Sequence, residues 1–245
     1  MDGTGPFGDG EGGFLPESGV ALVGGGLPES GVTLVGGGPV STRVLEDALR
    51  RAPRLVASDG GADACRARGL VPEVVAGDLD SLSPEARAAL ADRLVRDPGQ
   101  DDTDFAKALR AAGSAPVVLG VGFLGGRLDH ALAVLSHLAE RPPAAPPVVL
   151  VSDDDAAALC PPRLALGCAP GDRVSLWPLG PARLRSEGLR WPLDGLTLDP
   201  AGRVGTSNAA TGPVRLRCDG PCLVILDHAR LDALLAGLAA TRAVS

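Results

Sequence analysis

The sequence predicts an α/β fold in which a Rossmann-like, three-layer domain with a parallel sheet is followed by a smaller antiparallel β domain of sandwich or barrel form. Two observations predict this order. From residue 31 to about 155, apolar runs of strand length alternate with helical stretches, which is the pattern of a parallel sheet covered by helices. From about residue 160, short alternating runs separated by glycine- and proline-containing turns dominate, which is typical of antiparallel sheets.

The first part of the chain supplies the parallel strands and their covering helices. Ser41 or Thr42 can cap the first helix, and Ser83 followed by Pro84 is a common helix start. The expected strands are the apolar run before Gly36 and residues 54–58, 73–76, 94–96, 116–121 and 148–152. The expected helices are residues 41–51, 62–68, 84–91, 103–112 and 128–140.

A proline-rich segment, RPPAAPP at residues 141–147, ends the last of these helices. After it the expected elements are strands at 173–177, 183–186, 214–218 and 223–226 and a closing helix at 229–240. The predicted organisation is an N-terminal extension over residues 1–30, an α/β domain over 31–155, and a β domain with a C-terminal helix over 160–245.

The N-terminal region contains a tandem repeat. LPESGVALVGGG at residues 15–26 is followed directly by LPESGVTLVGGG at 27–38. Two copies of 12 residues are too few for a solenoid. Only the second copy leads into a helix, so we assign it as the first strand and place the first copy in the extension. The alternative is that the first copy adds an edge strand.

Charge and cysteine content limit the classes of partner. The net charge is −7 and no run of Lys or Arg is present, which argues against a nucleic-acid partner. No apolar run approaches the roughly 20 residues that span a bilayer, so we expect no membrane segment. The five cysteines are odd in number and form no CxxC pair, which favours free thiols in a reducing cytoplasm. An acidic protein can still bind a polyphosphate through a divalent cation.

Acidic side chains follow successive strands and helix starts of the predicted α/β domain. Because ligands of open parallel sheets bind outside the carboxyl ends of the strands, these groups should share one edge. Carboxylates gathered there repel one another unless a cation lies among them. The motifs are SDGGAD with Asp59, GDLDS with Asp78 and Asp80, QDDTDF with Asp104, and GGRLDH with Asp129.

GDLDS is the motif best suited to a metal. In extended backbone, residues i and i+2 point the same way, so Asp78 and Asp80 would offer two oxygen ligands to one Mg²⁺, and Gly77 would let backbone approach closely. Glycines at 36–38, 60–61 and 125–126 expose N–H groups to phosphate. No GxxxxGK[ST] loop is present, which excludes a P-loop enzyme.

Each motif also has a simpler interpretation. Asp78 and Asp80 could be solvated loop residues. Asp or Thr residues of QDDTDF could only cap a helix, and Lys107 could only pair with Asp104 at i,i+3. Arg127 and Asp129 could form a local ion pair. The joint presence of four acidic motifs at successive strand exits favours the metal site.

These four motifs, in this order and spacing, resemble the signatures of the thiamine pyrophosphokinase family. The C-terminal segments GDRVSLWPLG (171–180), EGLRWPL (187–193) and GTSN (205–208) resemble its β domain, and the similarity covers roughly residues 32–227. The resemblance implies transfer of the pyrophosphoryl group of ATP to the hydroxyethyl oxygen of thiamine, giving thiamine diphosphate and AMP. It also implies a homodimer that holds thiamine between the α/β domain of one subunit and the β domain of the other.

The resemblance further implies roles for individual residues. It assigns Mg²⁺ to Asp78, Asp80 and Asp104, with Arg127 as a further catalytic group. It assigns the nucleotide and the reacting phosphates to Asp59, Gly60, Gln100, Thr103, Arg127 and Asp129, and thiamine to Trp191, Ser207 and Asn208. Trp191 could instead be a core residue of the β domain. The chain departs from the family at Gly99, where the family usually has Asp; Asp101 or Asp102 could substitute.

Three alternatives remain open at the level of sequence. A pyrophosphokinase for another alcohol, such as a pterin, would share the acidic edge without needing Trp191 or GTSN. A non-enzymatic relative should have lost acidic ligands. A DxD nucleotidyltransferase would not explain QDDTDF together with GGRLDH.

Overall fold

The computed structural model describes residues 30–97, 99 and 102–243, so the first copy of the repeat and Gln100 lie outside the described residues. The strands of the α/β part are β1 (Val32–Val35), β2 (Arg54–Ser58), β3 (Val74–Gly77), β4 (Leu94–Arg96), β5 (Val118–Val121) and β6 (Val148–Val151). Its helices are α1 (Thr42–Arg51), α2 (Asp59–Arg66), α3 (Pro84–Ala89), α4 (Asp104–Ala111) and α5 (Leu128–Ala139).

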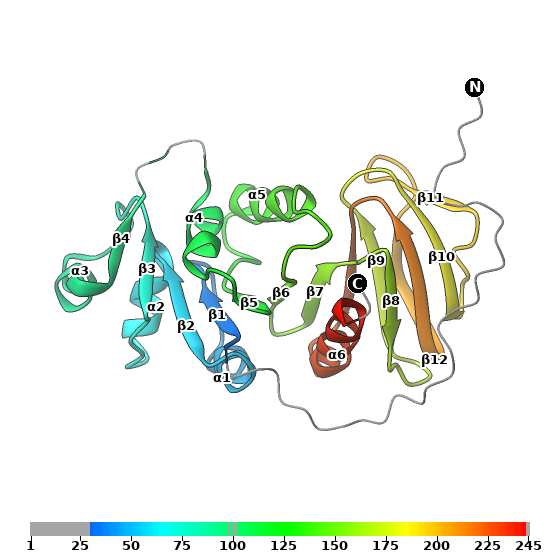
Figure 1. The fold of residues 1–245 in the computed structure, drawn as a ribbon, viewed down its shortest axis with the longest axis horizontal. Coiled ribbons are helices and arrows are strands. Elements are labelled where there is room, and N and C mark those ends of the chain that lie inside the picture. Colours follow the sequence, from blue (N-terminus) through cyan, green and yellow to red (C-terminus); the bar gives the residue numbers. More distant parts are fainter. Residues whose placement is uncertain (1–29, 98, 100–101, 244–245) are drawn as a thin grey trace.

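The parallel strands fall into two neighbouring sets. β1, β5 and β6 pair in parallel in that order, and β2, β3 and β4 form a second parallel set. The two sets meet where the N–H of Arg54 donates to the carbonyl of Gly31 at 3.2 Å, which places β2 beside β1 (Figure 1). The resulting strand order is β4-β3-β2-β1-β5-β6. After β1 the chain adds strands outward on one side up to β4 and then returns to add β5 and β6 on the other side, so the topological switch point lies between β1 and β5.

Helices cover both faces of this sheet, which confirms the three-layer arrangement. Leu34 of β1 packs in one apolar cluster with Phe105 of α4, whereas its neighbour Val35 packs in the other with Leu45 of α1 and Ala62 of α2. Alternate residues of a strand point to opposite faces, so α4 and α5 cover one face and α1 and α2 the other (Figure 1).

Hydroxyl side chains begin four of the helices. Ser41, Ser58, Ser83 and Thr103 each accept a hydrogen bond from the backbone N–H three residues later, at 3.1–3.3 Å. The caps expected at Ser41 and Ser83 are confirmed. The helix expected over 62–68 instead begins at Asp59, because Ser58 caps it. This shift places Asp59 in the first helical turn.

The antiparallel part continues directly from the parallel sheet, because β6 pairs with β7 and β7 pairs with β13. β12 is bent across two sheets: its first residues pair with β9, and its later residues pair with β8 and β10. The antiparallel β region expected after the α/β domain is therefore confirmed. Its elements are β7 (Asp155–Leu159), β8 (Arg163–Leu166), β9 (Arg173–Pro178), β10 (Ala182–Leu189), β11 (Leu196–Leu198), β12 (Gly205–Asp219), β13 (Cys222–Asp227) and α6 (Leu231–Arg242).

Three strands and half of a fourth were missed by the sequence pattern. β7 reads DAAAL and the first half of β12 reads GTSNAATG, and neither is rich in the β-branched or aromatic residues that favour strands. β8 and β11 have only four and three residues. Pairing to neighbouring strands, which sequence periodicity does not report, makes these segments extended.

Candidate active site

The four acidic motifs lie at the carboxyl ends of the strands or at helix starts, as predicted. Asp59 follows β2 and opens α2, Asp78 follows β3, Asp104 opens α4, and Asp129 lies in the first turn of α5. Three of these side chains meet: one carboxylate oxygen from each of Asp59, Asp78 and Asp104 lies within 4.8 Å of the other two. We call these three residues the acidic triad.

Local backbone explains why the triad can form. A Cβ atom at Gly77 would lie 2.9 Å from the carboxyl carbon of Asp59, so only glycine lets β3 approach this side chain. Asp104 stands in the first turn of α4 because Thr103 caps that helix. The remaining aspartate of SDGGAD, Asp63, is used elsewhere, since its carboxylate accepts the N–H of Ser83 at 3.1 Å.

The backbone geometry expected at GDLDS is wrong. Leu79 has φ +69°, so Asp78 and Asp80 do not follow each other in an extended strand. The chain turns instead: the N–H of Asp80 donates to Oδ1 of Asp78 at 3.1 Å, and Leu79 is buried while its carbonyl accepts from Arg87. Asp80 is exposed and outside the triad, and Asp59, which the resemblance placed at the nucleotide, takes the third position.

Burial and like charge disfavour the ionised form of two carboxylates of the triad, Asp59 and Asp104. Asp59 is 1% exposed, and among the described residues its Oδ2 has no hydrogen-bond partner. Burial, and then the charge of Asp104, raises the pKa of Asp59 to about 6. Burial, and then the charge of Asp78, also raises the pKa of Asp104. The N–H of Asp80 holds the pKa of Asp78 below its ordinary value.

Lys107 is the only basic side chain that the described residues show in ion-pair contact with the triad. Its Nζ lies 3.9 Å from Asp78 and 3.9 Å from Asp104, and the residue is 4% exposed. The sequence indicated the i,i+3 contact with Asp104 but not the contact with Asp78, which depends on how α4 packs against β3. One ammonium group against three carboxylates leaves an excess of negative charge that a divalent cation would neutralise.

The donor set fits such a cation. Hard oxygen ligands from three carboxylates suit Mg²⁺, and a buried carboxylate oxygen without a partner is the atom that a metal would satisfy. The acidic triad can therefore bind a metal ion.

Arg127 and Asp129 form a local ion pair, which was the simpler of the two interpretations of the GGRLDH motif. Nη2 of Arg127 lies 2.6 Å from Oδ2 of Asp129, its Nε lies 3.1 Å from Oδ1, and both side chains are about two-thirds exposed. This pairing raises the pKa of Arg127 and lowers that of Asp129 to about 2. A planar fork held toward solvent in this way can exchange one anion for another.

The glycine segments cross directly beside the triad. A Cβ atom at Gly37 would lie 3.2 Å from backbone atoms of Gly60, and one at Gly38 would lie 2.7 Å from the carbonyl oxygen of Gly122. The N–H of Gly60 donates to Oδ1 of Asp59 at 2.7 Å. The segment after β1 therefore packs backbone against backbone on the first turn of α2 and on the loop after β5, without side chains between them.

The β domain residues form a separate group. Trp191 is 54% exposed, so it is not the core residue that was one alternative. Asn208 is buried and holds the backbone of Trp191 through two bonds, from Nδ2 to the carbonyl at 2.7 Å and from the Trp191 N–H to Oδ1 at 3.2 Å. Ser207 is exposed with φ +59°, and the guanidinium of Arg190 lies 4.9 Å from the Trp191 ring centre.

This second group is distant from the triad within one chain. β2, β3 and α4, which carry the triad, lie at one end of the long axis, and β10 and β11, which flank Trp191, lie at the other (Figure 1). The structure thus brings Asp59, Asp78 and Asp104 together with Lys107, Thr103 and Gly60, but not with Trp191, Ser207 or Asn208.

The fold and the site define a two-domain transferase with an acidic, metal-competent edge on an α/β domain and an aromatic surface on a β domain. Two family models match these two parts: "Thiamin pyrophosphokinase, catalytic domain" over residues 45–149 and "Thiamin pyrophosphokinase, vitamin B1 binding domain" over residues 163–223. The chain belongs to the thiamin pyrophosphokinase family.

Solved structures agree with this fold. Thiamin pyrophosphokinase from Candida albicans matches with a TM-score of 0.71 at 17% identity, covering 80% of this chain and 89% of that one. The Bacillus subtilis thiamine pyrophosphokinase matches with 0.67 at 19% identity, covering 80% and 97%. The yeast enzyme matches with 0.67 at 16% identity, covering 85% and 89%. No helix among the described residues is both long enough and apolar enough to span a bilayer.

Proposed function

We propose that this chain transfers the pyrophosphoryl group of ATP to the hydroxyl of thiamine and releases thiamine diphosphate and AMP. The observation that carries the proposal is the acidic triad in a chain whose two parts match both domains of one kinase family. Transfer of a phosphoryl-type group depends mainly on positioning and on neutralising charge, and the acidic edge is suited to both once it holds a cation.

Asp59, Asp78 and Asp104 would hold Mg²⁺, and Asp80, two residues after Asp78 on the same loop, donates its N–H to the Asp78 carboxylate. When bound, the metal would neutralise charge on the transferred phosphates. Lys107 keeps Asp78 and Asp104 in place by its contacts to both. Arg127 would release Asp129 and offer its planar fork to phosphate oxygens.

Thiamine would bind at Trp191 of the β domain. Thiamine carries a cationic thiazolium ring, and an indole face attracts a cation by about 0.5–2 kcal/mol. Arg190 already lies over that ring at 4.9 Å, which supports a cation-accepting surface there. Asn208 acts through Trp191 as a positioning residue, since its amide is bonded to the Trp191 backbone.

A homodimer would join the two half-sites. Because the triad and Trp191 lie at opposite ends of one chain (Figure 1), a second copy is the simplest source of the missing half in each site. A twofold arrangement makes two identical composite sites.

The five cysteines are all free and buried, which is consistent with a protein that functions in the reducing cytoplasm.

The direct test is an AMP-release assay with ATP, Mg²⁺ and thiamine, run beside a panel of other alcohols that includes a hydroxymethylpterin. We expect AMP release that depends on thiamine and forms thiamine diphosphate in equal amount. AMP release that depends on another alcohol would instead identify a pyrophosphokinase for that alcohol. If no alcohol causes AMP release at any Mg²⁺ concentration, the chain would be a non-enzymatic relative of the family.

A further inference from the structure

Three of the five cysteines meet at one corner of the β domain. Cys160 follows β7, Cys218 lies near the end of β12, and Cys222 begins β13. Their side chains are hydrogen-bonded, with Cys218 between the other two. We call these three residues the thiol corner. No motif of the family resemblance contains any of them, and the proposed function gives them no role.

The backbone holds the thiol corner together across two sheets. β7 and β13 pair along their length, and beyond the last pair the N–H of Cys160 donates to the carbonyl of Cys222 at 2.8 Å. Pro161 and Pro162 then lead the chain to β8 of the second sheet, where the N–H of Cys218 donates to the carbonyl of Pro162 at 3.1 Å. Because proline fixes φ, this connection keeps Cys160 and Cys218 side by side on different sheets.

The thiol corner differs from the other two cysteines in its chemistry. Burial raises the pKa of Cys65 and that of Cys168 to about 11, which keeps these thiols protonated and inert. Hydrogen bonds from Cys160 and then from Cys222 instead lower the pKa of Cys218, and the same contacts raise the pKa of both donors. The thiolate is the reactive form of cysteine, so Cys218 is the first thiol of the corner to react.

The arrangement suits a bond between two sulfurs better than a metal ion. Among the described residues, only the acidic triad brings three ligand atoms within 4.8 Å of one another, so the three sulfurs do not converge on one ion. A disulfide needs only two sulfurs on backbones that already lie side by side. Thiols in hydrogen-bond contact reach that geometry by a small rotation of their side chains.

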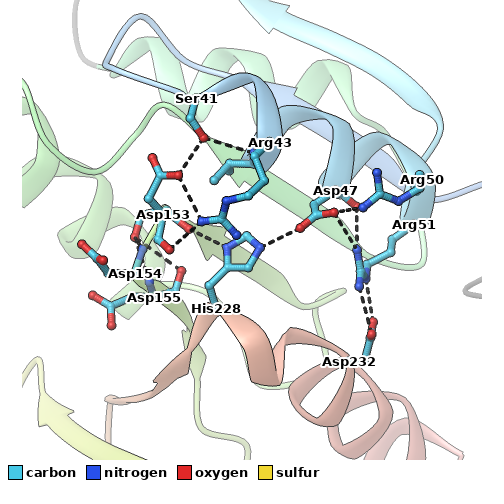
Figure 2. A network of polar contacts seen from close by, with 12 residues as sticks. Ser41, Arg43, Asp47, Arg50, Arg51, Asp153, Asp154, Asp155, His228 and Asp232 are labelled. Atoms are coloured by element: carbon cyan, nitrogen blue, oxygen red, sulfur yellow. Dashed lines mark hydrogen bonds and ion pairs between the residues drawn. The ribbon is translucent and has the colours of Figure 1, made fainter.

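Cys222 is the less suitable partner for Cys218 because its strand is fixed at both ends. At one end, a Cβ atom on Gly220 would overlap a backbone carbonyl oxygen of the connection between β9 and β10, so the turn before Cys222 has no room to shift. At the other end, His228 follows β13, with Nδ1 2.6 Å from the carbonyl of Ser152 and Nε2 2.9 Å from Asp47 of α1 (Figure 2).

Exposure also favours Cys160 as the partner. Cys160 and Cys218 are 8% and 7% exposed, whereas Cys222 is 0% exposed. A small oxidant from solvent therefore reaches the first two before the third, and a small thiol that reverses the reaction has the same access.

We propose that Cys160 and Cys218 form a reversible disulfide when the folded protein meets hydrogen peroxide, which cross-links the two sheets of the β domain. The Cys218 thiolate attacks one peroxide oxygen and becomes a sulfenic acid, and the other oxygen leaves and takes up a proton as water. The Cys160 thiol then attacks the sulfenic sulfur, and its proton leaves with the hydroxyl group as a second water. Two thiols lose two electrons in total, and one peroxide becomes two waters.

The disulfide would act on stability rather than on the acidic triad. It would close a loop that contains β8 to β12, which is most of the β domain. Cross-linking restricts the unfolded chain more as the closed loop grows, and for a chain of this size we expect the Tm to rise by about 10 °C. Two molecules of a small thiol would reduce the bond by exchange. The proposal does not depend on the proposed function.

Peroxide treatment of the reduced, folded chain tests the proposal by mass spectrometry. We expect the mass to fall by two hydrogens, two of the five thiols to be lost, and one peptide to join Cys160 to Cys218. Cys65→Ala and Cys168→Ala remove buried thiols elsewhere, so they are matched controls and should form the same bridge. A bridge from Cys218 to Cys222, or no thiol loss before the chain unfolds, would overturn the proposal.

Substitutions in the thiol corner separate the two roles. With dimedone present, Cys160→Ala should be labelled at Cys218, whereas Cys218→Ala should be neither bridged nor labelled and Cys222→Ala should still form the bridge. Oxidised wild type should melt about 10 °C above the reduced form, and Cys160→Ala should melt at the same temperature before and after treatment. Dimedone on Cys160 in Cys218→Ala, or an unchanged wild-type Tm, would contradict the proposal. The wild-type peptide map needs no variant, so the bridge stays testable if a substitution prevents folding.

Discussion

Asp59 has the least favourable environment of the residues at the site. It is almost fully buried, one of its oxygens lacks a partner among the described residues, and its neighbours Asp78 and Asp104 share its sign of charge. Such a group is retained for function more readily than for stability, because a neutral side chain of the same shape would avoid the penalty of burying charge.

Asp59→Asn should therefore stabilise the metal-free protein at pH 7.5. The folded pKa of about 6 lies above the value of 3.8 for an unperturbed carboxyl, so ionisation destabilises the folded state. This destabilisation is complete above pH 6 and absent below about pH 3.8, so the gain in the variant should shrink as pH falls. Its size should be about 1–3 kcal/mol, measured by urea unfolding in EDTA.

Magnesium should reverse this ranking. A ligand that binds only the folded state stabilises by RT ln(1 + [L]/Kd), so Mg²⁺ should raise the Tm of wild type and raise that of Asp59→Asn much less. The exposed Asp92→Asn is the control and should respond like wild type. A variant that is less stable than wild type in EDTA at pH 7.5 would contradict this account of the triad.

Asn208→Ala should separate positioning from packing in the β domain. The substitution removes both bonds that hold the Trp191 backbone, each contributing about 1 kcal/mol. We expect the thiamine KM to rise about tenfold with the ATP KM unchanged, measured by AMP release. Thr197→Ala, an exposed residue of β11, is the control. Equal increases in both KM values would indicate general loss of structure.

At the scale of elements, helix α2 is fixed to the sheet by glycine. A Cβ atom at Gly61 would overlap the carbonyl oxygen of Val35 and lie 3.2 Å from that of Gly36. Backbone cannot rotate away as a flexible side chain can. The position of α2, and with it the position of Asp59, therefore depends on this contact.

Gly61→Ala should destabilise the protein although it lies inside a helix. Alanine gains about 1 kcal/mol over glycine in helix propensity, but overpacking against backbone costs typically 1–3 kcal/mol, and we expect the clash to dominate. Urea unfolding should show a net loss. Gly212→Ala in β12, where a Cβ atom meets nothing within 4 Å, should be close to neutral; a loss there of similar size would remove the contact with β1 as the cause.

The helices and buried strands of the α/β domain could be predicted because their signals are local. Apolar runs such as VVLV and caps such as Ser83 act within a few residues. β7 and the first half of β12 could not be predicted, since their extended form comes from pairing with distant strands. The same limit applies at the site: the turn at Leu79, which separates Asp80 from the triad, depends on contacts such as that from Arg87.

At the scale of the whole molecule, the continuous run of strands from β1 to β11 places the acidic triad far from β10 and β11, which flank Trp191 (Figure 1). The joint between the α/β and β parts is itself paired strand, through β6, β7 and β13. Bending this joint far enough to bring Trp191 to the acidic triad would break those ladders. A second copy can supply the missing half without breaking any.

Hybrid dimers should therefore recover activity from two inactive chains. Asp78→Asn removes a triad ligand and Trp191→Ala removes the thiamine surface, so each homodimer should be nearly inactive at low thiamine. A hybrid with one chain of each kind would contain one site with both changes and one with neither. Co-expression with two different tags and sequential purification isolates it, and we expect about half the activity of a wild-type dimer. A hybrid as inactive as its parents would show that the triad and Trp191 of the same chain form one site.

The control is a hybrid of Asp78→Asn with Asp104→Asn. It should show no recovery, because both substitutions lie in the α/β domain and each of the two sites would carry one of them.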